Sequence, residues 1–448
     1  HPQQIANGCT HRFPFYFSFT RVNQLPRSID NPTSPRQHLP CPHRNCFSLN
    51  HASGPAIVPL MARRSQERLE IFFLAVVSGR LHGAWPSFLR FLLKQLSGLY
   101  SVIMNVRLAL YEHRILRSTT LGCQVISVGN LTVGGTGKTP VVEVFARALQ
   151  ENGRKVAILS RGYKKAELPF SVKLKNWLTF NTPTQQPPRI VSNGERLLLD
   201  SAMGGDEPYM LATNLPRVAV LVDKDRVKSG RYAIQKLGCD TLILDDGFQY
   251  LRLKHRVDIV LVDRTNPFDN GYVLPRGLLR ESHRHLSRAT FIFITKSTGD
   301  GSPELRRQIR ELNEHAEIAE CRHAPRHLQR IYSDERLPLS ALQGMKVSAL
   351  SGIAAPRGFE ETIERLGGEL VYRKRYADHH RYTQQEILDL INNSRDRGAD
   401  AIITTEKDAV RLPWVERCDI PMYYLRVEIE LLSGAEDFQE LISRICFK

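Results

Sequence analysis

Short runs of β-branched and aliphatic residues alternate with helical stretches from Cys123 onward. Most runs are apolar throughout, which is typical of strands that helices cover on both faces. This alternation predicts an α/β fold with a doubly wound, mostly parallel sheet. The runs expected to be strands are Val125–Val128, Val156–Leu159, Val218–Val222, Thr241–Leu244, Ile259–Val262, Phe291–Ile294, Val347–Leu350, Glu369–Tyr372 and Ala401–Thr404.

The order of these segments also suggests a division into domains. A polar stretch from about Cys321 to Leu337 is typical of a connection between two α/β units. We therefore expect a first domain over residues 119–325 and a second, smaller α/β domain over residues 326–448. A helical region, 61–118, precedes them.

Residues 1–60 have a composition that does not form a hydrophobic core. They are rich in Pro, Ser, Asn, His and Arg, contain no Lys, and have Asp30 as their only acid. A transit peptide is one interpretation, because such segments are basic and poor in acids. Translation from a point upstream of Met61 is the other. We adopt the second expectation, since it accounts for His1 at the first position.

The net charge of +16 favours an anionic partner, such as acidic lipid, a phosphorylated substrate or nucleic acid. The sequence lacks interleaved basic and aromatic residues of the single-strand-binding kind, so we do not expect nucleic acid as a partner. The eight cysteines are scattered without a zinc pattern, and we expect them to be reduced thiols.

The segment from Trp85 to Leu116 has the pattern of a basic amphipathic helix. Apolar residues recur at spacings of three and four, while Arg90, Lys94 and Arg107 interrupt them. No stretch reaches the roughly 18 to 20 uncharged residues that a transmembrane helix needs. The segment therefore suits either a helix at a membrane interface or one packed on the protein's own core.

A glycine-rich turn between the first strand and the helix Pro140–Asn152 is the strongest local signal. It resembles G-x-x-x-x-G-K-[ST], in which backbone N–H groups bind phosphate oxygens and a lysine reaches the β- and γ-phosphates. Thr132 replaces the first glycine, so a simple turn with a solvated lysine is the alternative. The residues expected to bind nucleotide are Thr132, Val133, Gly134, Gly135, Thr136, Gly137, Lys138 and Thr139.

Asp245 and Asp246 end the apolar run Thr241–Leu244, as acids do in a Walker B element. With the Thr139 hydroxyl they are the expected ligands of Mg²⁺. A turn at Asp246-Gly247 is the alternative. After the strand Phe291–Ile294 the sequence lacks the Asn and Asp of a guanine-binding motif, which favours ATP over GTP.

Taken together and in order, these and further motifs resemble the tetraacyldisaccharide 4'-kinase family of Gram-negative envelope biosynthesis. The resemblance covers most of the chain after about residue 85, and within this family Thr132 is not a departure. The matching segments are Ser127–Pro140, Leu159–Tyr163, Gly205–Pro208, Asp245–Gln249, Leu274–Glu281, Gly352–Ala354, Ala377–Tyr382 and Thr404–Asp408.

The resemblance implies a two-domain enzyme at the cytoplasmic face of the inner membrane, with residues 119–325 as the P-loop kinase core and the second domain closing over the active site. Such an enzyme uses ATP and Mg²⁺ to phosphorylate the 4'-hydroxyl of an acylated disaccharide 1-phosphate, and we expect no obligate protein partner. The alternative is a P-loop ATPase that acts as a membrane-associated binding or assembly module and transfers phosphate only to water.

The resemblance also implies the catalytic residues. Lys138 stabilises charge on the transferred phosphate, Asp206 is the expected base, and His379 pairs with Asp206 across the two domains. From residue type alone, Asp206 suits a helix N-cap and His379 a surface loop. Thr404–Asp408 shows a capping pattern to which we assign no chemistry.

Overall fold

The computed structural model describes residues 72, 75–77, 79, 81–134, 137–162, 187–416 and 419–447. The chain divides into two compact units, residues 1–63 and 64–448, and all described residues belong to the second. The expectations for residues 1–60 therefore lie outside the described part of the chain.

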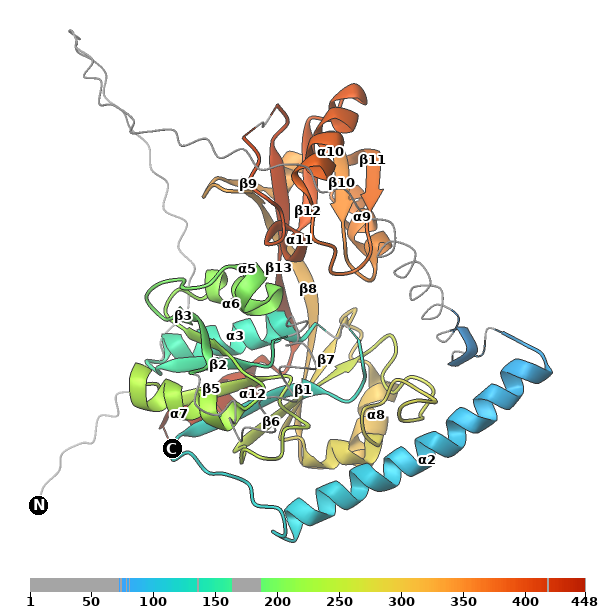
Figure 1. The fold of residues 1–448 in the computed structure, drawn as a ribbon, viewed down its shortest axis with the longest axis vertical. Helices are drawn as coiled ribbons and strands as arrows, with labels where there is room; N and C mark the ends of the chain where they lie inside the picture. Colours follow the sequence, from blue (N-terminus) through green and yellow to red (C-terminus); the bar gives the residue numbers. More distant parts are fainter. Residues whose placement is uncertain are drawn as a thin grey trace, which may run out of the picture. The chain divides into compact units, whose positions relative to one another are not determined.

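The described strands form one extended sheet, in the order β11-β10-β12-β13-β8-β7-β6-β1-β5-β2-β4-β3, with β9 paired to β8 (Figure 1). All nine runs expected to be strands are strands, so the predicted α/β fold is confirmed. The strands are β1 Gln124–Asn130, β2 Val156–Ser160, β3 Arg189–Asn193, β4 Ala219–Val222, β5 Thr241–Asp245, β6 Val257–Asp263, β7 Phe291–Thr295, β8 Glu317–Arg330, β9 Arg336–Pro338, β10 Lys346–Ser351, β11 Glu369–Arg375, β12 Ala401–Thr405 and β13 Met422–Ser433.

The first lobe is built on the parallel strands β7-β6-β1-β5-β2-β4, with β3 antiparallel at the edge. Strand β1 lies between β5 and β6, and Val128 pairs with Asp245. Parallel strands deliver their carboxyl ends to one edge of a sheet. The register therefore brings the loop after β1 and the acids that end β5 to the same place.

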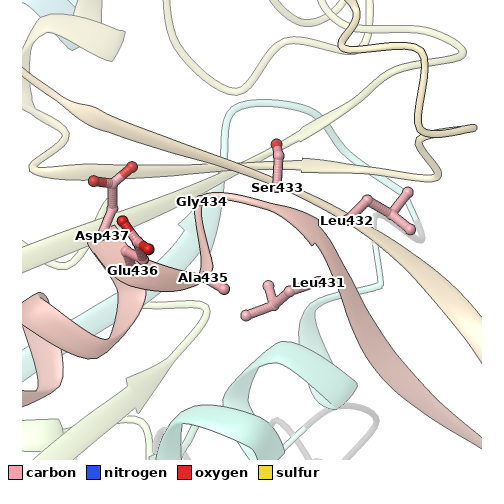
Figure 2. Close-up of a pocket in the computed structure, with 7 residues that line it drawn as sticks. All are labelled: Leu431, Leu432, Ser433, Gly434, Ala435, Glu436 and Asp437. Atoms are coloured by element: carbon pink, nitrogen blue, oxygen red, sulfur yellow. The ribbon is translucent and has the colours of Figure 1, made fainter. Parts of the chain in front are cut away.

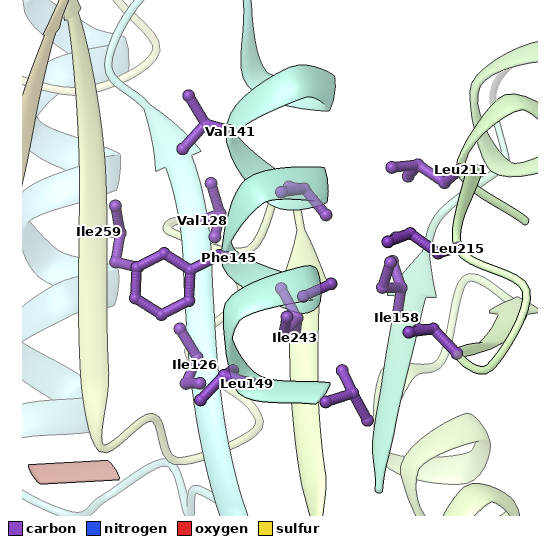
Figure 3. Close-up of a cluster of buried hydrophobic side chains, with 14 of the residues drawn as sticks. Ile126, Val128, Val141, Phe145, Leu149, Ile158, Leu211, Leu215, Ile243 and Ile259 are labelled. Carbon is purple, nitrogen blue, oxygen red and sulfur yellow. The ribbon is translucent and has the colours of Figure 1, made fainter. Parts of the chain in front are cut away.

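Helices cover the sheet and close the core around β1, as Figure 3 shows for the side chains near Phe145. Burial of apolar surface on this scale is the main force that holds the lobe together. The helices are α2 Ala84–Glu112, α3 Lys138–Glu151, α5 Ser201–Gly204, α6 Asp206–Asn214, α7 Arg226–Leu237, α8 Pro303–Leu312, α9 Pro356–Arg365, α10 Gln384–Asp396, α11 Glu406–Ala409 and α12 Ala435–Phe447, with short 3-10 turns at His283–Arg288 and Leu339–Leu342.

Strands β8 and β13 are long and antiparallel, and they run between the first and second lobes (Figure 1). We expected the polar stretch from about Cys321 to Leu337 to connect two α/β units, and the structure adds that much of it is strand β8. The charged residues of this segment do not give the apolar pattern of a buried strand. Arg322 of β8 pairs with Glu430 of β13 on the exposed surface of these two strands. Cross-strand ion pairs of this kind add to the stability of a strand whose exposed positions are charged and whose other side chains are buried or partly buried.

The second lobe contains the parallel strands β11-β10-β12-β13 and their helices. The chain then returns along β13, and helix α12 packs in the core of the first lobe. Phe438 of α12 meets Phe145 edge to face, with ring centroids 5.2 Å apart. The division at residue 326 stays a prediction, and the structure adds that the last helix belongs to the first core.

Helix α2 confirms the helix expected between Trp85 and Leu116. One side of it contacts the protein: the Ser97 hydroxyl donates to the Val273 carbonyl at 2.8 Å, and the Tyr100 hydroxyl donates to the Arg280 carbonyl at 2.9 Å. Its other side exposes a row of large apolar side chains, namely Trp85, Phe88, Phe91, Leu92, Leu96, Leu99, Val102, Ile103 and Val106. In the described residues, no helix is both long and apolar enough to span a bilayer.

The core contact between α3 and α12 leads to a stability prediction. Phe145 has no exposed surface, so Phe145→Ala removes buried apolar area and leaves a cavity. We expect the free energy of unfolding to fall by about 3–5 kcal/mol in urea titrations. Phe88→Ala is the matched control, since Phe88 is 57% exposed, and it should change the unfolding midpoint little. Equal effects of the two substitutions would contradict this account of the core.

Candidate active site

The loop after β1 is shaped to bind phosphate. Gly137 has a φ of 79° and is the N-cap of α3, so the free N–H groups of the helix start directly after the loop. A Cβ at this position would lie 2.3 Å from the His323 ring, which adds a steric reason for glycine. Gly135 and Thr136, two of the residues expected to bind nucleotide, lie outside the described residues.

The segment Leu274–Glu281 supports this loop through the backbone. The Val133 N–H donates to the Leu278 carbonyl, and the Arg280 N–H donates to the Leu131 carbonyl, both at 2.7 Å. Thr132 forms an isolated antiparallel bridge with Leu279. The residue in place of the first motif glycine is thus held by backbone pairing with the segment Leu274–Glu281.

Lys138 lies at the start of α3 and points toward the end of β5. Its Nζ is 3.3 Å from Asn130 Oδ1 and 3.5 Å from Asp246 Oδ1. Asp246 also accepts two hydrogen bonds from Arg280 Nη1, at 2.7 and 2.8 Å. Burial by itself raises the pKa of the Asp246 carboxyl, but Lys138 and Arg280 outweigh burial and lower it.

Asp245 is in a different electrostatic position from its neighbour. Its side chain is buried and accepts a hydrogen bond from the Ser160 hydroxyl at 3.2 Å. Among the described residues, no basic side chain forms an ion pair with it. Burial, followed by the negative charge of Glu207, raises the pKa of Asp245 to about 6. The structure therefore holds a buried carboxylate whose charge is poorly compensated.

These oxygens suit Mg²⁺. Magnesium prefers hard oxygen ligands, keeps several waters, and is usually held by one or two carboxylates together with substrate phosphates. The described residues include no group of three or more acidic, His or Cys side chains placed to hold a metal alone. Asp245 and the buried Thr139 fit such a partial site, whereas Asp246 is already engaged by two cations.

Asp206 and His379 meet across the two lobes. Asp206 is the first residue of α6, whose N-cap is Gly205, and no side chain caps this helix. The capping alternative for Asp206 is therefore not what the structure shows. His379 Nδ1 lies 3.5 Å from Asp206 Oδ2. The adjacent His380 instead contacts Glu386 at 3.1 Å.

Two arginines from the second lobe also contact Asp206, and the sequence analysis assigned no role to either. Arg411 Nε donates to Asp206 Oδ2 at 2.8 Å, and Arg381 Nη2 donates to Oδ1 at 3.0 Å. Burial would raise the pKa of Asp206, but the His379 contact and the Arg411 charge outweigh it and lower the pKa. Only the spacing of Arg411, three residues after the Thr404–Asp408 motif, could have drawn attention to it.

Glu207 connects this pair to the phosphate loop. It accepts a hydrogen bond from Lys407 Nζ at 2.7 Å. Burial raises the pKa of Glu207, while the charges of Lys407, Lys138 and His379 lower it more. Because Glu207 also acts on Asp245, the predicted residues from the loop, from β5 and from the second lobe form one electrostatic group.

The motif Thr404–Asp408 positions the second lobe's contribution. Thr405 is the N-cap of α11 and accepts a hydrogen bond from the Asp408 N–H at 3.2 Å, so the expected capping pattern is confirmed.

A cavity of about 310 Å³ lies elsewhere, at the junction of β13 and α12, and is lined by Leu431–Asp437 (Figure 2). None of the predicted site residues lines that cavity.

The fold and this site define the class of a two-lobed P-loop kinase. A model of the tetraacyldisaccharide-1-P 4'-kinase family matches residues 89–446. The chain belongs to this family, and the family predicted from the motifs is confirmed.

Curated relatives and a crystal structure support the assignment. The tetraacyldisaccharide 4'-kinase of Anaeromyxobacter sp. (strain K) is 40% identical over 337 residues, which is 74% of this chain and 84% of the relative. The enzyme of the same name from Syntrophus aciditrophicus (strain SB) is 36% identical, covering 78% of this chain and 91% of the relative. The "apo" form of LpxK from Aquifex aeolicus in complex with ATP is similar with a TM-score of 0.62 and 29% identity, covering 80% of this chain and all of that one.

The contrast between Asp245, which ends β5, and the following Asp246 gives predictions of opposite sign for the two substitutions. Asp245 has a folded-state pKa of about 6 against an ordinary 3.8, so its ionised form destabilises the folded protein above pH 6. Asp245→Asn should raise the free energy of unfolding at pH 7 by about 3 kcal/mol, a gain that shrinks as the pH falls from 6 to 4. Urea titrations at pH 7.5 and 4.5 measure it.

The matched control is Asp246→Asn. Its pKa is lowered by Lys138 and Arg280, so its ionised form stabilises the fold, and the substitution should destabilise the protein at pH 7.5. Asparagine tolerates the φ of 55° at this position, so the backbone is not the cause. The same sign for both variants would show that the charge environments are not as described.

Proposed function

We propose that this chain transfers the γ-phosphate of ATP to the 4'-hydroxyl of a tetraacyldisaccharide 1-phosphate. One observation carries the proposal: Asp206 of the first lobe and His379 of the second lobe meet as a pair, 3.5 Å apart. Family membership supports the same reaction, and the related Aquifex structure contains ATP.

The loop after β1 binds and orients the triphosphate in this proposal. The start of α3 supplies backbone N–H donors for phosphate oxygens, and Lys138 stabilises negative charge at the γ-phosphate. Asn130 and Asp246 hold the Lys138 ammonium in place before ATP binds. Thr139 and Asp245 would hold Mg²⁺, with Asp246 in the surrounding layer, and the ion would neutralise charge on the β- and γ-phosphates.

Asp206 is the base in the proposed reaction. The acceptor's 4'-oxygen forms a bond to the γ-phosphorus, the bond from that phosphorus to the bridging oxygen breaks, and ADP leaves. The hydroxyl proton passes to the Asp206 carboxylate, which His379 orients. The lowered pKa of Asp206 keeps it ionised at neutral pH and ready to accept that proton.

We further propose that α2 places the enzyme on the membrane that holds its lipid substrate, as a peripheral protein on the cytoplasmic face of the inner membrane. The exposed apolar row of α2 suits burial in a bilayer interface, and its basic residues suit anionic headgroups. The opposite side of the helix is hydrogen-bonded to the protein, so docking leaves this row available.

The reaction is tested with purified protein, MgATP and a tetraacylated disaccharide 1-phosphate, followed by mass spectrometry of the lipid. We expect a bisphosphorylated product, with kcat lowered by a factor on the order of 10² or more in Lys138→Ala, Asp206→Ala and His379→Gln. His380→Gln is the matched control, because His380 contacts Glu386 and not Asp206. ATP consumption without a lipid product would favour the ATPase alternative.

The membrane role is tested by sedimentation with vesicles that contain anionic phospholipid. Phe91→Glu and Leu99→Glu place charges on the exposed row and should weaken vesicle binding at least about tenfold. Trp414→Glu is the control, since Trp414 is 62% exposed but lies in the second lobe. Vesicle binding that is equally strong in all three variants would exclude α2 as the membrane contact.

A further inference from the structure

Arg411 occupies an unusual position for an arginine, because its side chain is fully buried at the meeting of the two lobes. One guanidinium contacts both members of the catalytic pair: Nε donates to Asp206 Oδ2 at 2.8 Å, and Nη2 lies 3.1 Å from His379 Nδ1. We propose that Arg411 is the positioning residue that assembles this pair and fixes which oxygen of Asp206 receives the proton. The inference rests on the proposed function.

Arg411 is itself held rigidly by motifs that had no assigned chemistry. Its Nη1 donates to the Gly352 carbonyl at 3.2 Å and to Asp408 Oδ1 at 3.3 Å. Asp408 has no exposed side-chain surface and accepts hydrogen bonds from the Tyr382 hydroxyl and the Gly352 N–H. The three segments around Gly352, Tyr382 and Asp408 thus form one socket for this guanidinium.

The socket also explains a glycine. A Cβ at Gly352 would lie 2.7 Å from the Tyr382 hydroxyl and 3.0 Å from Asp408 Oδ1, so any larger residue would disturb the contacts that hold Arg411. The Gly352 carbonyl accepts from the His379 N–H at 3.2 Å as well. Backbone and guanidinium therefore place His379 through the same glycine.

The contact with Arg411 is the shorter of the two contacts made by His379 Nδ1. A guanidinium can only donate hydrogen bonds, and its Nη2 lies 3.1 Å from Nδ1 of His379. At 3.5 Å the direct contact between His379 and Asp206 is longer than either contact with Arg411. Arg411 is therefore the principal link between the two residues.

The two oxygens of Asp206 are held unequally. Oδ2 is bound by the buried Arg411, and breaking this contact would leave an uncompensated buried charge. Oδ1 is bound by Arg381, whose side chain is 50% exposed and can exchange its contact for water or substrate at little cost. Oδ1 is thus the oxygen that accepts the proton of the 4'-hydroxyl.

An arginine that only stabilises the fold would make the same contacts. The test therefore needs measurements that loss of stability alone would not change. Arg411→Met, Arg411→Lys and the control Arg375→Met are compared with wild type in the lipid kinase assay over a range of pH. Arg375 pairs with Glu360 in the same lobe, away from Asp206. Thermal melting establishes the fraction folded for each variant.

We expect Arg411→Met to lower kcat by roughly 10- to 100-fold per folded molecule, with the KM for ATP within about twofold of wild type, because the phosphate loop belongs to the other lobe. The acidic limb of its kcat/KM profile should move to higher pH, since Asp206 loses a buried cation. Arg411→Lys restores the positive charge, so the acidic limb of its kcat/KM profile should move back toward that of the wild type. Its kcat should stay low, because an ammonium group cannot contact Asp206 and His379 with the geometry of a guanidinium.

A second measurement does not depend on activity. In ¹⁵N-histidine-labelled protein, the Nδ1 resonance of His379, assigned by its loss in His379→Gln, should shift in Arg411→Met and stay unchanged in Arg375→Met, because the Arg411 guanidinium contacts Nδ1. An Nδ1 resonance unchanged in Arg411→Met, or an unmoved acidic limb with kcat within threefold of wild type, overturns the inference. Absence of lipid product from the wild type would instead overturn the proposed function, while the His379 resonance still tests Arg411.

Discussion

The meeting of charges from both lobes at Asp206 is the interaction on which the site depends. A carboxylate with only 13% of its side chain exposed is stable in ionised form because three groups from the second lobe contact it. Removing one member of such a buried set leaves an uncompensated charge, which costs more than the pair itself contributes. The proposed catalytic pair is therefore complete only when the lobes are together.

A second buried network holds the same interface further from the phosphate loop. Nη1 of Arg426 in β13 donates to both carboxylate oxygens of Glu406 in α11, at 2.7 and 2.8 Å, while Nη2 donates to Glu143 of α3. Asn214, at the end of α6, donates to both glutamates. The helix that follows the phosphate loop and the helix that carries Asp206 are thus tied to the second lobe by one arginine and one amide.

Much of the fold follows from local sequence, and the exceptions have physical causes. Buried parallel strands such as Thr241–Asp245 are apolar throughout, so they are visible in the sequence. Strand β8 is not, because it is stabilised by its long partner β13, far along the chain, and by charges such as Arg322 on its exposed surface. The return of α12 to the first core is likewise a tertiary contact without a local signal.

The candidate site also contains some residues that the sequence indicates and others that only the packed structure reveals. Lys138, Asp206, Asp245 and His379 could be named from motifs, since their chemistry is recognisable in sequence. Arg411 could not, because an arginine near the end of a short helix ordinarily looks like a solvated charge, and only the packed structure reveals that it is buried. The unequal charge compensation of Asp245 and Asp246 also required coordinates, since it depends on where Arg280 reaches.

The docking of α2 has a mechanical consequence under the proposed membrane orientation. Its Tyr100 is bonded to the carbonyl of Arg280, the residue whose backbone N–H supports the phosphate loop and whose guanidinium grips Asp246. A short, continuous chain of contacts thus runs from the lipid-facing helix to the phosphoryl-transfer centre. These contacts fix the distance between the membrane-bound helix and the phosphate loop. The lipid headgroup would therefore meet the nucleotide at one set distance from the bilayer surface.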